Sequence, residues 1–350
     1  MTRCVFAIPG DLAMPSGGYV YARKIIPLLA KSFRLELCRL PTGFPLASEA
    51  EQDEAAAALA VLDAPGTTFF MDGLAYGALR RSTLQALRSP MAALVHHPLG
   101  LEEGLPPAKK AHLLSTEAEA LTLARCIVTP SRRTAQELTR LFRVPTGKIT
   151  IAEPGILRGK RAQGAKAGAP LHIVSAGTLT PRKGFGVLID ALHAVRDLPW
   201  RATIAGSVDA WPDTAAQVRR KISDYEFSER VRLAGHLDEA SLSSLYSSGD
   251  IFALASLYEG YGMVFAEAMA HGLPVVASGE GAVRYTMPPS AGFYCAAGDA
   301  VAFAEALRAL LSDAALRREK AEAAWRHGQT LPDWESTASK IAHTLESAAR

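Results

Sequence analysis

The sequence predicts an α/β protein of two Rossmann-like domains, each built on a parallel sheet. The chain has 350 residues, more than one hydrophobic core usually organises. Short apolar runs alternate with helical patterns along most of it, as in successive βα units. The alternation stops over 157–170, a stretch rich in Gly, Ala and cations, which is typical of a linker. We therefore expect an N-terminal domain over 1–156 and a C-terminal domain over 171–328.

Short apolar runs predict the strands of both sheets. In the first domain they cover 5–8, 34–39, 68–71, 92–96, 124–129 and 148–152. In the second domain they cover 171–176, 201–205, 231–234, 251–255 and 274–277, and helical patterns cover 184–195, 213–225, 239–247 and 263–271. Because open parallel sheets bind ligands at the carboxyl ends of their strands, we expect the functional residues in the loops that follow strands.

Bulk composition argues against several classes of protein. The net charge of +3 is too small to indicate a nucleic-acid partner. The four cysteines contain no C-x-x-C pair, which argues against a zinc ribbon or a disulfide framework and favours a reducing compartment. The N-terminus lacks the features of a signal peptide, and no run approaches the roughly 18 apolar residues of a membrane span. We expect a cytoplasmic protein.

The strongest motif is a glycine-punctuated passage from Ser256 to Ser278, which runs from a strand end through a short helix into a buried strand. Gly260 and Gly262 leave the N-terminus of that helix uncovered. The free N–H groups of Met263 and Val264, together with the helix dipole, predict a seat for an anion.

Two carboxylates flank this seat, eight positions apart. Glu259 lies in the loop before the helix, and Glu267 lies on its second turn. A carboxylate on that turn can accept two hydrogen bonds from a vicinal diol such as ribose. An isolated pair of glutamates is usually a solvated surface feature, but the glycine context favours a binding site.

A second motif, Ser175 to Leu192, follows the first strand of the second domain. It carries Arg182 and Lys183 in a loop that leads into a helix. Such a pair is ordinarily a solvated charge. Its place between strand and helix, at the mouth of the same sheet, favours neutralisation of a departing diphosphate.

Both motifs resemble the retaining glycosyltransferases of family 4, which have the GT-B architecture of two facing Rossmann-like domains with an interdomain cleft. The resemblance covers most of the chain. Its elements are an E-x7-E motif at Glu259 to Glu267, a phosphate-binding loop at Pro181 to Gly184, a flexible glycine loop at Gly17-Gly18 followed by Tyr21, and hinge segments at 128–131 and 148–155.

The resemblance implies a role for each motif residue. Glu259 would contact a hydroxyl of the donor sugar, and Glu267 would contact the ribose. Arg182 and Lys183 would hold the diphosphate. The other donor-binding positions would be Gly17, Gly18 and Gly177 and the N–H groups of Gly262, Met263 and Val264.

His96 matches a histidine that faces the transferred sugar in similar enzymes. It is followed by a second histidine, His97, where the family more often has an acidic or amide residue, and a histidine that only caps a strand is the alternative. Two other departures are Ser207, where a second glycine is common, and Gly281 to Tyr285, which replaces a Gly-Gly-x-x-Glu pattern.

The implied reaction moves a sugar from a nucleoside-diphosphate sugar to an acceptor hydroxyl of a glycan, lipid or small molecule, with retention of configuration. The chain contains no D-x-D sequence, so we expect neither a metal nor a cofactor. Arg182, Lys183 and the helix N-terminus would stabilise the leaving diphosphate. Front-face attack, in which the leaving phosphate accepts the acceptor proton, fits the resemblance, and no carboxylate nucleophile is evident.

Other interpretations are open. A nucleotide-sugar epimerase or a phosphorylase on the same architecture would form product without the acceptor that a transferase needs. Against a non-catalytic sugar-nucleotide-binding protein stand the intact Glu259, Glu267, Arg182 and Lys183, because a purely structural domain has no use for cations and carboxylates that converge on one loop face. A dehydrogenase would need a G-x-G-x-x-G after the first strand of a domain, and neither half contains one.

The acceptor is expected on the N-terminal domain. The stretch 125–166 contains ten cations and two acids, a net charge of +8. This bias suits a peripheral contact with an anionic lipid surface at the inner membrane face. Solvated helix faces and a basic linker are the alternative explanation.

The end of the chain predicts one more helix, over 333–350. Pro332 interrupts the preceding pattern, and Asp333 is a candidate N-cap. The apolar face of this helix consists of Trp334, Ala338, Ile341, Ala342 and Leu345. In enzymes of similar sequence the final helix returns to the N-terminal domain, so we expect it to complete that domain.

Overall fold

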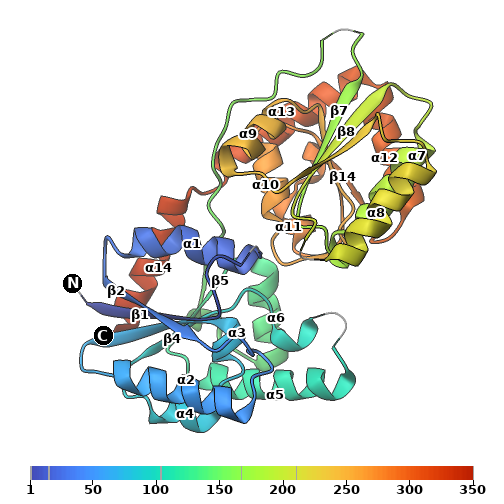
Figure 1. The fold of residues 1–350 in the computed structure, drawn as a ribbon. Helices are drawn as coiled ribbons and strands as arrows, with labels where there is room; N and C mark the ends of the chain where they lie inside the picture. Colours follow the sequence, from blue (N-terminus) through green and yellow to red (C-terminus); the bar gives the residue numbers. More distant parts are fainter. Residues whose placement is uncertain (1, 15, 103–104, 167, 210, 350) are drawn as a thin grey trace. The chain divides into compact units, whose positions relative to one another are not determined.

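The structure is a computed structural model that describes residues 2–14, 16–102, 105–166, 168–209 and 211–349. The chain divides into two compact units (Figure 1). The first comprises Met1–Gly155 and Pro332–Arg350, and the second comprises Ile156–Leu331. Each unit contains a six-stranded sheet whose strands all pair in parallel, so the predicted α/β class is confirmed.

The first sheet has the strand order β2-β1-β3-β4-β5-β6. Its strands are β1 (Arg3–Pro9), β2 (Arg34–Leu40), β3 (Thr67–Asp72), β4 (Met91–Leu94), β5 (Cys126–Thr129) and β6 (Ile149–Ile151). All six were expected from their apolar runs. Strand β4 ends at Leu94, so His96 lies in the loop beyond the strand rather than at its last position.

Helices cover both faces of this sheet. In Figure 1, α1 and α14 lie on one face and α2, α4 and α5 on the other. The helices are α1 (Gly17–Leu29), α2 (Glu49–Leu62), α3 (Gly73–Tyr76), α4 (Arg81–Ala86), α5 (Pro107–Leu123), α6 (Arg132–Phe142) and α14 (Trp334–Ala349), with 3₁₀ turns η1 (Leu99–Leu101) and η2 (Thr146–Lys148).

The expected flexible glycine loop is helical in this structure. Gly17 and Gly18 form the first turn of α1, after Ser16 in an extended N-cap conformation. The helix starts this early because buried side chains recur at helical spacing from Tyr19 to Ile25.

The second sheet has the order β14-β12-β10-β7-β8-β9. Its strands are β7 (Leu171–Ala176), β8 (Trp200–Ala205), β9 (Val231–Gly235), β10 (Ile251–Leu254), β12 (Val275–Ser278) and β14 (Gly292–Cys295), and a separate two-stranded ladder joins β11 (Tyr258–Glu259) to β13 (Glu280–Gly281). Strand β14 was not predicted, because it has four residues, two of them only half-buried, and so gives no distinct apolar run.

The helices of the second unit flank its sheet on both sides (Figure 1). They are α7 (Phe185–Ala194), α8 (Pro212–Asp224), α9 (Glu239–Ser247), α10 (Met263–Ala270), α11 (Val283–Thr286), α12 (Ala300–Ser312) and α13 (Ala314–Thr330), with 3₁₀ turns η3 (Pro181–Lys183) and η4 (Pro289–Ala291). The four helices predicted here, α7 to α10, lie within one residue of their expected ends.

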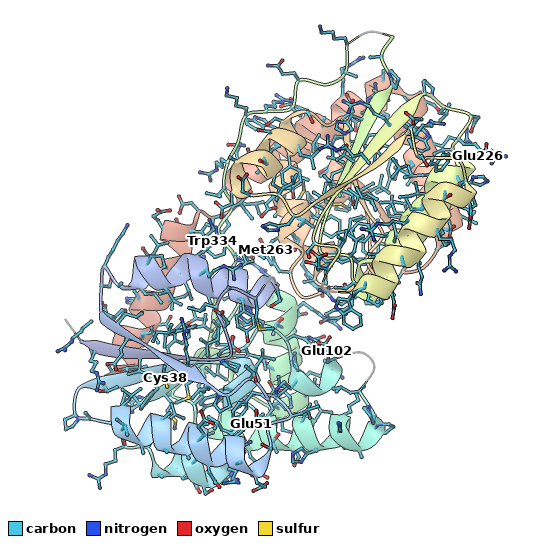
Figure 2. The ribbon with its side chains drawn as sticks, viewed as in Figure 1. Cys38, Glu51, Glu102, Glu226, Met263 and Trp334 are labelled. Atoms are coloured by element: carbon cyan, nitrogen blue, oxygen red, sulfur yellow. The ribbon has the colours of Figure 1, made fainter. Side chains whose placement is uncertain are left out.

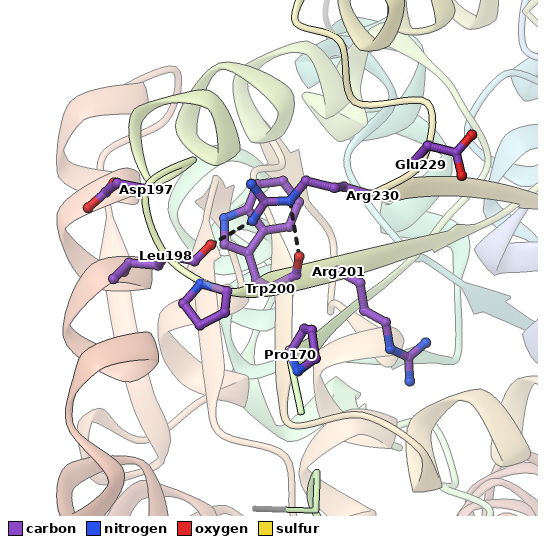
Figure 3. Close-up of a pocket in the computed structure, with 8 residues that line it drawn as sticks. Pro170, Asp197, Leu198, Trp200, Arg201, Glu229 and Arg230 are labelled. Carbon is purple, nitrogen blue, oxygen red and sulfur yellow. Dashed lines mark hydrogen bonds between the residues drawn. The ribbon is translucent and has the colours of Figure 1, made fainter. Parts of the chain in front are cut away.

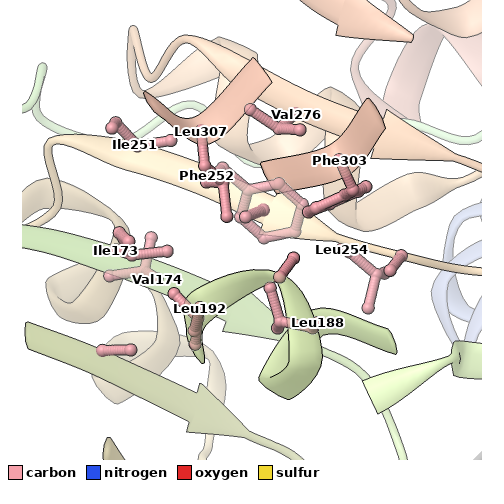
Figure 4. Close-up of a cluster of buried hydrophobic side chains, with 14 of the residues drawn as sticks. Ile173, Val174, Leu188, Leu192, Ile251, Phe252, Leu254, Val276, Phe303 and Leu307 are labelled. Carbon is pink, nitrogen blue, oxygen red and sulfur yellow. The ribbon is translucent and has the colours of Figure 1, made fainter. Parts of the chain in front are cut away.

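The core of the second unit lies where α7 and α12 pack against the central strands. Leu188 and Leu192 of α7 and Phe303 of α12 are buried with Phe252 of β10 (Figure 4). Burial on both faces explains why these strands are continuous apolar runs. This packing fixes β7 and β10, and therefore the loops that follow them.

The predicted linker is attached to the second unit along much of its length. The carboxylate of Asp250 accepts the N–H of Ala165 at 2.6 Å and the N–H of His172 at 2.7 Å. The N–H of Ala162 donates to the carbonyl of His271 at 2.8 Å. Residue 167 lies outside the described residues. The described part of 157–170 is therefore an ordered strap and not a free tether.

Helix α14 belongs to the first unit and packs against α1 and the sheet. Asp333 caps it by accepting the N–H of Ser336 at 2.8 Å. Trp334, labelled in Figure 2, contacts the ring of Tyr21 edge-on at 5.4 Å. A Cβ on Gly155 would lie 2.2 Å from the backbone nitrogen of Trp334, so only glycine lets the two chain segments approach each other here. No helix of the described residues is long and apolar enough to cross a bilayer.

Candidate functional site

Strands β7 and β10 are neighbours at the point where the strand order of the second sheet reverses. The loops that follow them therefore meet at the carboxyl edge of the sheet, where open α/β sheets bind their ligands. The loop after β7 carries Arg182 and Lys183, and the loop after β10 carries Glu259.

These three residues form one network around a buried carboxylate. The side chain of Glu259 is 6% exposed. Its Oε1 accepts hydrogen bonds from Lys183 Nζ at 2.6 Å and from Ser256 Oγ at 2.6 Å. Its Oε2 lies 3.4 Å from Nη1 of Arg182. Ser256 was not among the predicted site residues, although it stands at the start of the motif.

The network has a definite electrostatic character. Burial by itself would raise the pKa of Glu259, but the charges of Lys183 and Arg182 outweigh it and hold that pKa below its usual range. Glu259 is therefore ionised at neutral pH. Two cations against one carboxylate leave one positive charge in excess, which suits the site to an anionic ligand.

A glycine allows the two loops to approach each other. Gly184 adopts φ 58°, ψ 29° after η3, and a Cβ there would lie 1.9 Å from the carbonyl oxygen of Ala255. The N–H of Leu257 donates to the carbonyl of Arg182 at 2.7 Å. These backbone contacts place the cations before any ligand arrives.

The N-terminus of α10 opens beside this network. Gly262 caps the helix in the left-handed region, at φ 84°, ψ 51°, and has no side-chain acceptor to offer. Met263 and Val264 occupy the first turn and are half-buried. Their N–H groups belong to the set that has no partner within a helix, and the anion seat stays a prediction.

The two remaining predicted positions of this unit lie nearby in the fold. Gly177, directly after β7, adopts φ 154°, and a Cβ there would lie 3.3 Å from the Lys183 side chain, so glycine makes room for the lysine. Glu267, on the second turn of α10, is half-buried. Its Oε2 accepts a hydrogen bond from the Tyr246 hydroxyl at 2.9 Å.

His96 lies in the first unit, in the loop after β4. Its ring contacts Tyr21 edge-on at 5.2 Å, and a Cβ on Gly18 would lie 3.2 Å from it. Burial lowers the pKa of His96 to about 4, so the imidazole is neutral at pH 7. Its Nε2 is buried and makes no hydrogen bond, although a quarter of the side chain is exposed elsewhere.

Asp72, which was not among the predicted site residues, faces this nitrogen. Asp72 ends β3, and its Oδ2 lies 3.8 Å from His96 Nε2. Its Oδ1 accepts the N–H of Leu74 at 2.9 Å, and burial raises its pKa to about 7. Strands β1 and β3 flank the reversal of strand order in the first sheet. A carboxylate at the last position of a fully buried strand was the available signal.

The pKa of Asp72 predicts a pH-dependent stability. Its folded pKa is raised above the usual value of about 3.9, so ionisation costs stability as pH rises from about 4 to about 7. Asp72→Asn keeps an acceptor for Leu74 but cannot ionise. We expect its thermal midpoint, relative to that of the unmodified protein, to rise between pH 4.5 and pH 8.

A control of opposite sign is available at Asp63. Burial would raise its pKa, but hydrogen bonds from Arg88 and Ser89 outweigh burial and lower it. Asp63→Asn should therefore lose stability relative to the unmodified protein as pH rises through about 4, and this loss should stay constant between pH 4.5 and pH 8. Equal shifts for Asp72→Asn at both pH values would contradict the assigned ionisation.

In the described part of the chain, neither a metal-ligand cluster nor the cations of 125–166 extend the site. Among the described residues, no group of three or more His, Cys, Asp or Glu side chains is placed to hold a metal ion. The cations of 125–166 are divided between the two units, and several are engaged: Arg133 with Glu137, Lys148 with the Ala124 carbonyl, Arg158 with the Leu331 carbonyl, and Arg161 with Glu322.

A surface hollow lies at the opposite edge of the second sheet, where β7, β8 and β9 begin (Figure 3). Arg230 stacks over the Trp200 ring at 3.8 Å and donates to the carbonyls of Trp200, Arg196 and Leu198. Its guanidinium is thus occupied in holding the strand ends together, and the hollow is structural.

Comparison with known proteins finds a family match in the second unit. Residues 170–313, which include β7, β10, η3 and α10, match the family model described as Glycosyl transferases group 1. Residues 170–313 of the second unit are therefore similar in sequence to the glycosyl transferases group 1 family. The matched range contains every predicted site residue of the second unit, from Gly177 to Glu267.

Relatives of this family are similar over part of their length. Glycogen synthase of Mycobacterium tuberculosis is 29% identical over 231 residues, 64% of this chain and 54% of that protein. D-inositol 3-phosphate glycosyltransferase of Streptomyces avermitilis is 25% identical over 269 residues, 71% of this chain and 57% of that protein. Phosphatidyl-myo-inositol mannosyltransferase of Mycobacterium leprae is 35% identical over 173 residues, which are 48% of this chain and 44% of that protein. The chain spans about half the length of these relatives.

Solved structures share the fold along the whole chain. Sucrose-phosphate synthase from Thermosynechococcus elongatus superposes with a TM-score of 0.82 at 20% identity, over 99% of both chains. Anabaena HepE in complex with UDP superposes with a TM-score of 0.75 at 16% identity, over 99% of this chain and 100% of that chain. The predicted GT-B fold class is confirmed.

Proposed function

We propose that this protein is a retaining glycosyltransferase of family 4 that moves a sugar from a nucleoside-diphosphate sugar to an acceptor hydroxyl without a metal ion or cofactor. The observation that carries the proposal is the buried Glu259, paired with Lys183 and Arg182 in the loops after β7 and β10. The names of the relatives support the reaction class, and the UDP in the HepE structure supports the donor class.

In this proposal Lys183 and Arg182 bind the diphosphate together with the N–H groups of Met263 and Val264. As the anomeric C–O bond stretches, negative charge grows on the leaving phosphate, and fixed cations stabilise it most when they need no rearrangement. Glu259 and the backbone contact to Leu257 already hold both cations in place. The helix dipole adds a favourable potential of the same sign.

The carboxylates take the sugar and the nucleoside. Glu259 is ionised and accepts a hydrogen bond from a hydroxyl of the transferred sugar, and Glu267 accepts from the ribose diol. His96 is neutral at pH 7, so it contributes hydrogen bonding to a sugar hydroxyl and no positive charge. Asp72 stands against its Nε2 and positions the ring.

For the transfer itself we propose attack from the face that the diphosphate leaves. The acceptor oxygen forms the new bond to the anomeric carbon while the bond to the phosphate oxygen breaks. That phosphate oxygen takes the proton of the acceptor hydroxyl, so no protein base is required. Stabilisation of an oxocarbenium-like state falls to the leaving diphosphate and to Glu259.

Activity is expected to persist in excess EDTA, because fixed cations replace a bridging metal at the diphosphate. The test screens UDP-, GDP- and ADP-sugars for donor hydrolysis and for transfer to glycan, inositol phosphate and inositol lipid acceptors, with and without EDTA. Loss of turnover on chelation, restored by magnesium or manganese, would contradict the metal-free proposal. Isomerised donor in the absence of acceptor would instead indicate an epimerase.

A further inference from the structure

The carboxylate of Glu267 accepts a hydrogen bond from a buried tyrosine. The hydroxyl of Tyr246 donates to Glu267 Oε2 at 2.9 Å. Tyr246 lies on α9, is 2% exposed, and is not part of either sequence motif. Burial and the neighbouring carboxylate raise its pKa well above the usual value, so the hydroxyl remains protonated and acts as a donor at every working pH.

The tyrosine ring is itself immobilised by the groups around it. It contacts Phe252 of β10 at 5.9 Å and His271 at 5.2 Å. His271 ends α10, where its Nδ1 lies 2.8 Å from the backbone carbonyl of Glu267 and its Nε2 lies 2.9 Å from Ser243 Oγ. The carboxylate of Glu267 is therefore held by a side chain of α9, and its backbone carbonyl by the C-cap histidine of α10.

A fixed carboxylate matters for recognition of a diol. A glutamate side chain loses on the order of 1.5–2 kcal/mol of rotamer entropy when it is ordered. If the folded protein already orders the glutamate side chain, ligand binding does not have to supply that entropy loss. A hydrogen bond from an immobile ring to one carboxylate oxygen restricts the rotation of that carboxylate.

We propose that Tyr246 is a positioning residue that holds Glu267 in the orientation required to bind the ribose diol of the donor nucleotide. The proposal rests on the proposed function, in which Glu267 contacts ribose. It goes beyond that function because it makes ribose recognition depend on a residue that touches no substrate. A merely structural tyrosine would affect stability and the binding of all nucleotides alike.

The test measures the affinity of the full chain for UDP and for 2′,3′-dideoxy-UDP by calorimetry. Tyr246→Phe is expected to weaken UDP binding about tenfold, since a hydrogen bond to a charged group contributes a factor of that order. The dideoxy ligand, which has no diol, should bind the variant and the unmodified protein equally. GDP and ADP, each with its dideoxy form, are titrated in the same way.

Tyr225→Phe is the matched control, because its hydroxyl also donates to a carboxylate, Asp190, at 2.9 Å. It should leave both affinities unchanged. Glu267→Ala and the double variant Glu267→Ala/Tyr246→Phe should bind UDP equally, because the tyrosine acts only through the glutamate. This comparison remains decisive if Tyr246→Phe lowers the thermal midpoint.

Two results would overturn the inference while leaving the proposed function intact: unchanged UDP affinity in Tyr246→Phe, or an equal loss for UDP and its dideoxy form. If the unmodified protein bound none of the three nucleoside diphosphates, the proposed function itself would fail and the inference with it.

Discussion

Replacement of Lys183 by alanine is expected to lower kcat/KM by about 10²- to 10³-fold, the usual cost of removing one preorganised group that stabilises developing charge. Lys183 Nζ lies 2.6 Å from Glu259 and is only 13% exposed on its side chain. Its loss removes a cation from the proposed diphosphate seat and also leaves the buried Glu259 with Arg182 as its one cationic partner. Steady-state kinetics with the preferred donor measure the effect.

Lys221→Ala is the control for this experiment. Its Nζ also pairs with a carboxylate, Asp190, at 2.5 Å, but this pair is more exposed than Lys183 with Glu259, at 39% and 32% of the two side chains, and stands outside the proposed site. We expect unchanged kinetics there, because exposed ion pairs contribute little. Lys183→Arg, which keeps the charge but not the geometry, should retain part of the activity. A folded Lys183→Ala protein with unmodified kinetics would remove the lysine from the mechanism.

Deletion of Pro332 to Arg350 is expected to unfold the first unit. Helix α14 buries Trp334, Ile341 and Leu345 against that unit. At roughly 2 kcal/mol for each large side chain, their loss costs about 6 kcal/mol, which is comparable to the total stability of a typical domain. The truncated chain should expose apolar surface, aggregate and lose activity. Solubility, dye binding and thermal unfolding measure these changes.

Point variants show whether the loss of side-chain packing, and not the shortening of the chain, causes the effect of the deletion. Trp334→Ala should lower the thermal midpoint markedly, because the indole is 7% exposed and contacts Tyr21. Glu335→Ala, one position along on the exposed side of the helix, should have little effect. A truncated protein that stays soluble, cooperative and active would contradict the role of α14 in the first unit.

The sequence was informative where a pattern is repeated or a motif is contiguous. Buried strands such as β7 and β10 are apolar runs bounded by loops, and both were expected. The network around Glu259 could be anticipated because Lys183 follows one of these strands and Glu259 follows the other, and parallel strands bring their carboxyl ends together.

Other features depend on contacts that leave no local pattern. Asp72 and His96 are 24 positions apart, and only the neighbouring places of β3 and β4 in the sheet bring them within 3.8 Å. The strap over 157–170 lacks apolar periodicity because backbone groups hold it, such as the Ala165 N–H on Asp250. Tyr246 was overlooked because a buried tyrosine on a helix is ordinarily only core.

The central claim is that the Lys183, Arg182 and Glu259 network, with the N-terminus of α10, is a seat for the diphosphate of a nucleotide sugar. Calorimetric titration of the unmodified protein with the preferred nucleoside diphosphate, its monophosphate and its nucleoside tests it most directly. We expect the diphosphate to bind at least about tenfold more tightly than the monophosphate, since charge-assisted contacts to the second phosphate add roughly that factor. Equal affinities for all three would contradict the account.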